Sequence, residues 1–193
     1  MSYLFLGEGP NDKLIVPIIL EVHNIEIVQS DFKTWKSIHG RGLRGFKKKA
    51  MFAIKLARLD GKKGLVATLD ADNQPNRIKD LDAARKEDRE NLSTHPILVV
   101  IGQANPEIEA WLLDDAEAVK KGLGISSEAK IPSPYRVSDV KVALDALFEE
   151  SSIEGRANCL ASVARQVQCE RSRSPDKSGL RSFIEGAKTE TIS

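Results

Sequence analysis

The sequence has few cysteines, few aromatic residues and no long apolar run. Only two of its 193 residues are cysteine and 5% are aromatic. Cys159 and Cys169 lack the CxxC or Cys/His spacing that is typical of zinc sites, so we expect reduced thiols. No apolar run approaches the roughly 20 residues that cross a bilayer. The first residues also lack the basic segment of a signal peptide, and an acid follows early. These absences predict a cytoplasmic protein without a membrane span.

The overall charge is nearly balanced, but the middle of the chain is locally basic. The net charge of +1 predicts no polyanion partner by itself. Between residues 32 and 64, however, eleven Lys or Arg stand against one acid, and this density can hold phosphates locally. Glycines in the same segment allow close approach of the chain to a nucleic-acid backbone. We therefore expect non-specific phosphate contacts from Arg41, Arg44, Lys47, Lys48 and Lys49. A solvated face of an exposed helix is the alternative for the same residues, and too few aromatics interleave to predict a base-stacking platform.

Apolar runs alternate with amphipathic stretches over the first hundred residues. Strands are predicted at residues 3–6, 25–29, 65–69 and 97–101, and helices at 12–22, 46–59 and 77–91. This alternation favours βαβ units, and strands without polar alternation fit a sheet covered on both faces. After residue 101 the pattern becomes helical, with helices at 107–120, 139–148, 157–167 and 180–187, and with residues 171–177 as a solvated loop. The prediction is an α/β domain over residues 1–124, built on a mostly parallel four-stranded sheet flanked by helices, and a helical C-terminal extension over 125–193.

Four acids follow the ends of two predicted strands. Glu8 and Asp12 come after the first strand, four residues apart across a turn, and Asp70 and Asp72 come after the third. In open α/β sheets the carboxyl ends of the strands form the crevice that binds ligands. Carboxylates there suit Mg²⁺, which takes one or two of them together with phosphate oxygens of a substrate. Any one of these acids alone could be a turn or capping residue, but the four together predict a metal site for phosphoryl transfer.

A further acidic segment follows the fourth predicted strand. Asn105 suits a helix N-cap, Pro106 suits the first helical position, and Glu107 in the first turn would complement the helix dipole. Capping explains Glu109 less well, because Glu109 leads into an apolar stretch beside Trp111. We expect Glu109 either to complete the metal site or to orient a basic side chain.

Together these motifs resemble the Toprim fold of topoisomerases, bacterial primases and overcoming-lysogenization-defect (OLD) nucleases. The resemblance covers about residues 1–120 and consists of Glu-x-x-x-Asp after the first strand and Asp-x-Asp after the third. The segment from Pro106 to Asp115, Pro-Glu-Ile-Glu-Ala-Trp-Leu-Leu-Asp-Asp, looks like that of small stand-alone Toprim-like proteins, some of them associated with phage defence. The resemblance implies a divalent metal, Mg²⁺ or Mn²⁺, held by Glu8, Asp12, Asp70 and Asp72, with Glu107 or Glu109 as a further acid.

The resulting hypothesis is metal-dependent hydrolysis of nucleic-acid phosphodiesters. Its catalytic residues would be Glu8, Asp70, Asp72 and Glu109, and its metal ligands Glu8, Asp12, Asp70, Asp72 and Glu107. The chain has no Gly-x-x-x-x-Gly-Lys-Ser/Thr loop and no convincing nucleophilic tyrosine, which argues against a built-in ATPase and against topoisomerase chemistry. One alternative is a non-catalytic subunit or sensor that works with a separate ATPase. A weaker one is a phosphotransferase or nucleotide hydrolase for small molecules.

Overall fold

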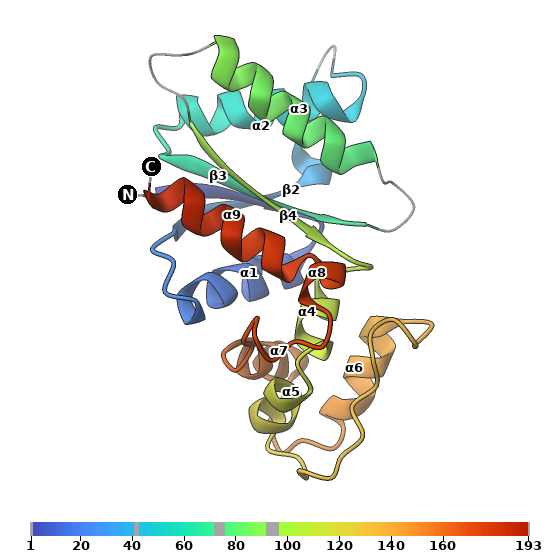
Figure 1. Ribbon diagram of the computed structural model, residues 1–193. Coiled ribbons are helices and arrows are strands. Elements are labelled where there is room, and N and C mark those ends of the chain that lie inside the picture. Colours follow the sequence, from blue (N-terminus) through green and yellow to red (C-terminus); the bar gives the residue numbers. More distant parts are fainter. Residues whose placement is uncertain (1, 41–42, 72–75, 92–96, 193) are drawn as a thin grey trace.

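The computed structural model describes residues 2–40, 43–71, 76–91 and 97–192, and its centre is a four-stranded sheet (Figure 1). The strands are β1 (Ser2–Gly7), β2 (Val28–Thr34), β3 (Gly64–Asp70) and β4 (Leu98–Ala104). They lie in the order β2-β1-β3-β4, and the three neighbouring pairs are all parallel. The predicted α/β fold with a parallel four-stranded sheet is therefore confirmed.

Helices cover both faces of the sheet, as unbroken apolar strands require. Figure 1 shows α1 (Pro10–Val22) and α9 (Leu180–Ile192) on one face, and α2 (Phe46–Leu59) and α3 (Asn76–Asn91) on the other. Successive side chains of a strand point to opposite faces. In β1, Tyr3 and Phe5 pack in the core under α1 and α9, whereas Leu4 and Leu6 pack in the core under α2 and α3. The two separate cores hold the sheet rigid between two helical layers.

A group of short helices, here called the helical lobe, lies to one side of the sheet (Figure 1). It comprises α4 (Glu109–Leu113), α5 (Ala116–Leu123), α6 (Val140–Phe148), α7 (Arg156–Ala164) and α8 (Pro175–Ser178). The chain then returns to the sheet, where α9 packs along β4. Trp111 of α4 stacks on Phe183 of α9 with ring centroids 5.0 Å apart. The division predicted at residue 124 stays a prediction, and α9 adds a sheet-covering helix to the C-terminal part.

The predicted helix over residues 107–120 is wrong in its start and in its continuity. The Asn105–Pro106 peptide bond is cis, and α4 begins at Glu109 with Ile108 as its N-cap. The helix ends at Leu113, and Asp115 starts α5 by accepting a hydrogen bond from the Ala118 backbone N–H at 2.9 Å. An aspartate that caps a new helix thus divides an apolar stretch whose spacing suits one continuous helix.

Two further expectations need correction. The second strand runs from Val28 to Thr34 rather than over 25–29, because Ile25 and Ile27 fill the core beside α1 from the segment before the strand. Residues 171–177 are not simply a solvated loop. Arg171 donates to the buried carboxylate of Asp115 at 3.2 Å, and Arg173 donates to backbone carbonyls of the helical lobe. These arginines hold the returning chain against the lobe.

The strand order creates a switch point at the carboxyl edge of the sheet. From β1 the chain moves through α1 to β2 on one side, and from β3 it moves through α3 to β4 on the other. Neighbouring β1 and β3 are therefore followed by connections that diverge, and such a switch point leaves a crevice. Glu8 follows β1 and Asp70 ends β3, so both acids belong to this crevice. Within the described residues, no helix is both long enough and apolar enough to span a membrane.

Candidate metal centre

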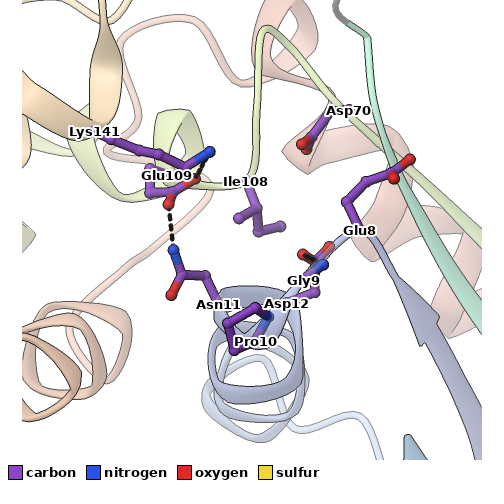
Figure 2. A pocket seen from close by; sticks show the side chains of 9 residues that line it. All are labelled: Glu8, Gly9, Pro10, Asn11, Asp12, Asp70, Ile108, Glu109 and Lys141. Carbon is purple, nitrogen blue, oxygen red and sulfur yellow. Dashed lines mark hydrogen bonds and ion pairs between the residues drawn. The ribbon is translucent and has the colours of Figure 1, made fainter. Parts of the chain in front are cut away.

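A small cavity of about 160 Å³ lies at this switch point, and carboxylates dominate its polar lining. Figure 2 shows Glu8, Asp12 and Asp70 on one side of it and Glu109 with Lys141 on the other. The first three come from the carboxyl ends of β1 and β3 and from the first turn of α1. Glu109 and Lys141 come from the helical lobe. Sheet and lobe thus each supply one wall.

Asp12 is fixed by two hydrogen bonds where α1 begins. Its side chain is 3% exposed, and its Oδ2 accepts from the backbone N–H of Gly9, the N-cap residue, at 3.1 Å. Its Oδ1 accepts from the hydroxyl of Thr68 in β3 at 2.6 Å. Burial raises the pKa of Asp12, while the hydrogen bonds from Thr68 and Gly9 partly oppose this effect. The acid is thus rigidly placed in a position that disfavours its charge.

Gly7 makes room for this arrangement. A Cβ atom at Gly7 would lie 2.5 Å from the Cβ and 2.7 Å from the Cγ of Asp12. We expect Gly7→Ala to lower the free energy of unfolding by about 2 kcal/mol, because the hydrogen-bonded Asp12 cannot move aside without losing its partners. Chemical denaturation measures the change. Gly9→Ala is the matched control, since Gly9 has extended backbone and a Cβ atom added there would meet no atom within 4 Å. Equal stability of the two variants would contradict the close contact at Gly7.

Asp70 is the carboxylate whose charge the protein disfavours most clearly. Its pKa is raised to about 8 by burial, then by the negative charges of Asp12 and Glu8, with a smaller contribution from Glu109 against the opposing Lys141. Its Oδ1 is buried and has no hydrogen-bond partner among the residues that the structure describes. The cavity therefore gathers more carboxyl groups than can all be ionised near neutral pH without a positive partner. A divalent cation is a group that would favour their ionised form.

Glu8 is held on the far side of the cavity by an arginine. Nη1 of Arg77, in the first turn of α3, lies 2.7 Å from Oε1 of Glu8. The guanidinium also stacks on Phe46, with its carbon 4.5 Å from the ring centroid. This contact joins the site to the start of α2, where the basic segment continues.

Glu107 and Glu109 contact basic side chains of the helical lobe. Oε2 of Glu107 lies 2.5 Å from Nζ of Lys141, and Oε2 of Glu109 lies 4.0 Å from the same nitrogen. Glu109 is fully buried, accepts a hydrogen bond from Asn11 and lies 3.7 Å from Nη2 of Arg156. Partial burial acts to lower the pKa of Lys141. This pKa is nevertheless raised by the hydrogen bond to Glu107 and by the charges of Glu109, Glu107 and Asp70. Of the two expectations for Glu109, its contacts fit the orientation of basic side chains.

The predicted metal ligands only partly come together. Glu8, Asp12 and Asp70 share the cavity, Glu107 contacts Lys141 outside its lining, and Asp72 lies outside the described residues. In the described parts of the chain, no three His, Cys, Asp or Glu side chains are arranged to hold a metal ion by themselves. Because Mg²⁺ is commonly held by one or two carboxylates together with substrate oxygens, the hard oxygen donors and the unpaired Asp70 oxygen fit such an ion.

The predicted phosphate-binding residues lie around the start of α2. Arg44 and Lys48 are exposed and Lys49 is half-buried, whereas Arg41 lies outside the described residues. Lys47 forms an ion pair with Glu87 of α3 at 2.7 Å. Lys47 thus already has a counter-ion within the fold.

Sequence reasoning missed Thr68, Arg77, Lys141 and Arg156. Thr68 could have been found, because it stands two residues before Asp70 in a strand and so shares its face. The other three carry no such signal, since their place at the site depends on how α3 and the helical lobe pack. Comparison of the chain with protein-family models, curated proteins and solved structures finds no match.

Proposed function

We propose that this protein hydrolyses phosphodiester bonds in nucleic acid with the help of Mg²⁺ or Mn²⁺. One observation carries the proposal: carboxylates from two strand ends converge on one cavity, and the pKa of Asp70 is raised to about 8 there. Carboxyl groups gathered where they cannot all be ionised by themselves suit a site that binds a cation. The resemblance of the acidic motifs to Toprim nucleases supports the same activity, with phage defence as the proposed context.

In this proposal each wall of the cavity has its own task. Asp70, Asp12 and Glu8 would hold the metal, and Asp72 is proposed as a further ligand. When bound, the cation would neutralise phosphate charge and make a water more acidic. Lys141 would contact a non-bridging phosphate oxygen, where a fixed positive charge stabilises the developing negative charge. Lys141 would be kept in position by Glu109, Glu107 and Arg156. The nucleic-acid backbone would be contacted by Arg44 and Lys48.

The test is incubation of the purified protein with labelled single-stranded DNA, duplex DNA and transfer RNA. Each substrate is combined with Mg²⁺, with Mn²⁺ or with EDTA. We expect cleavage of at least one substrate with a metal and none with EDTA. If no substrate is cleaved in a metal-dependent manner, the nuclease proposal is wrong.

A second candidate is a non-catalytic subunit that works with a separate ATPase. Two features favour it: Glu8 is engaged by Arg77, and the described residues provide no three-ligand cluster. Binding of Mn²⁺ to the isolated protein without cleavage of any substrate would support this candidate over the first.

A further inference from the structure

Arg77 occupies a position that the metal site alone does not explain. It is the second residue of α3, and its side chain is 16% exposed. Glu8 holds it by charge at 2.7 Å, and the ring of Phe46 holds it by stacking. A guanidinium gripped in this way is preorganised, so it loses little conformational freedom on meeting a second oxyanion.

Its surroundings connect the cavity to the basic segment. Phe46 is the first residue of α2, directly before Lys47 and Lys48. Phe46 also packs against Trp35, whose Nε1 donates to the Thr68 carbonyl at 2.8 Å. Arg77 therefore stands between the carboxylates and the basic start of α2.

A cation thus lies on each side of the carboxylates. Figure 2 shows Lys141 on the side of the helical lobe and Glu8 on the opposite side. Arg77 lies behind the lining of the cavity, 2.7 Å from Glu8. A nucleic-acid strand that places one phosphate at the carboxylates would bring a neighbouring phosphate to Arg77. A guanidinium suits that role because its planar fork matches phosphate oxygens as well as it matches a carboxylate.

We propose that Arg77 binds a phosphate next to the one that is cleaved. In the substrate-free protein its counter-ion is Glu8. With metal and substrate present, the metal would compensate Glu8 and the phosphate would compensate Arg77, so that neither half-buried charge would be left alone. This inference rests on the proposed function, and it narrows the substrate class to strands with at least two consecutive phosphodiesters.

Two substrates test it, a labelled oligonucleotide and bis(p-nitrophenyl) phosphate, which has a single phosphate. We expect Arg77→Ala to raise KM for the oligonucleotide ~10- to 100-fold, the size of a lost charge-assisted hydrogen bond, with little change in kcat. Hydrolysis of the small diester should stay at the wild-type rate. Lys79 is an exposed lysine of the same helix, and Lys79→Ala is the matched control. This control should leave KM and kcat unchanged for both substrates. Arg77→Gln, which keeps a donor for Glu8, serves as a second variant if the alanine variant does not fold.

An equal loss with both substrates would overturn the proposal, because Arg77 would then act only through Glu8 and the metal. Wild-type kinetics of the variant with the oligonucleotide would overturn it as well. Oligonucleotide binding is measured separately in Ca²⁺, where the slope of log K against log salt should fall by about one in Arg77→Ala. If the wild type cleaves neither substrate, the proposed function fails. The Ca²⁺ binding measurement then decides the role of Arg77 by itself, with an unchanged slope as the overturning result.

Discussion

Replacing Asp70 by asparagine is expected to lower metal-dependent cleavage of nucleic acid by about 10³-fold while the protein stays folded. Asparagine keeps the shape of the side chain and removes its charge. In the wild type this carboxylate ends β3 with a buried oxygen that no described residue hydrogen-bonds. If that oxygen is a metal ligand, the variant loses the ligand without leaving a cavity in the core. Rates are compared at saturating Mn²⁺, and the Mn²⁺ affinity of each protein is measured by titration calorimetry.

The control for this experiment is Asp60→Asn. Asp60 is an exposed acid at the C-cap of α2, outside the cavity lining, and its loss removes the same charge from the protein. We expect its activity and Mn²⁺ affinity to equal those of the wild type. If Asp70→Asn also keeps wild-type Mn²⁺ affinity, Asp70 does not bind the metal and the proposed site is wrong.

In EDTA, the free energy of unfolding is expected to fall as the pH rises from about 4 to about 8, and Asp70→Asn should remove most of this loss. The folded-state pKa of Asp70 is raised from 3.8 to about 8, so between these values the folded protein binds more protons than the unfolded chain. Stability then decreases with rising pH, and it is highest below the unfolded pKa. Independent titration would cost ~1.4 kcal/mol of unfolding free energy per pKa unit. Because Asp70 titrates together with Asp12 and Glu8, we expect roughly half of that total, about 3 kcal/mol.

Denaturant unfolding at a series of pH values measures this slope. Asp70→Asn should be more stable than the wild type at pH 8 in EDTA, and Mn²⁺ should stabilise the wild type more than the variant. Asp82→Asn provides a control of opposite sign. Burial acts to raise the pKa of Asp82, but Lys86 and Arg85 outweigh burial and lower this pKa. Loss of the Asp82 carboxylate should therefore destabilise the protein at neutral pH. If the free energy of unfolding of the wild type falls with pH no more steeply than that of Asp70→Asn, ionisation of Asp70 does not destabilise the fold and the expectation is wrong.

The sheet was predictable because its signal is local. Apolar runs of four or five residues, separated by helices, specify parallel strands with both faces covered, and β1, β3 and β4 lie where those runs are. The second strand was misplaced because Ile25 and Ile27 are apolar for a different reason: they fill the core from a connecting segment. Hydropathy records that a residue is buried, and it does not record whether its backbone pairs with a neighbouring strand.

The site was predictable on one wall and not on the other. Glu8, Asp12 and Asp70 follow strand ends, and parallel strands bring their carboxyl ends to one edge. Lys141 lines the cavity from α6, and Arg156 of α7 contacts Asn11 and Glu109 of its lining; both helices begin about seventy or more residues after Asp70 in the chain. Their position depends on packing between α4, α6 and α7, for which a single sequence gives no distance. Arg77 is close in sequence to the acids, but its ion pair with Glu8 and its stacking on Phe46 depend on how α3 packs beside α2, which the sequence does not show.

The helical lobe leaves the sheet and returns to it at almost the same point. The backbone N–H of Asn105 donates to the Ser178 carbonyl at 3.1 Å, and its side chain donates to the carbonyl of Lys177. The lobe is therefore an insertion between β4 and α9, and besides these hydrogen bonds at its base it packs on α1 through α7 within one shared hydrophobic core. The carboxylates from β1, α1 and β3 belong to the sheet, whereas Lys141 and Arg156 belong to the insertion. An exchange of the segment between Asn105 and Ser178 would thus replace Glu109 and Lys141 in the cavity lining and leave the acids of the sheet in place. Under the proposed function, such an exchange would test whether substrate choice can be changed without changing the metal ligands.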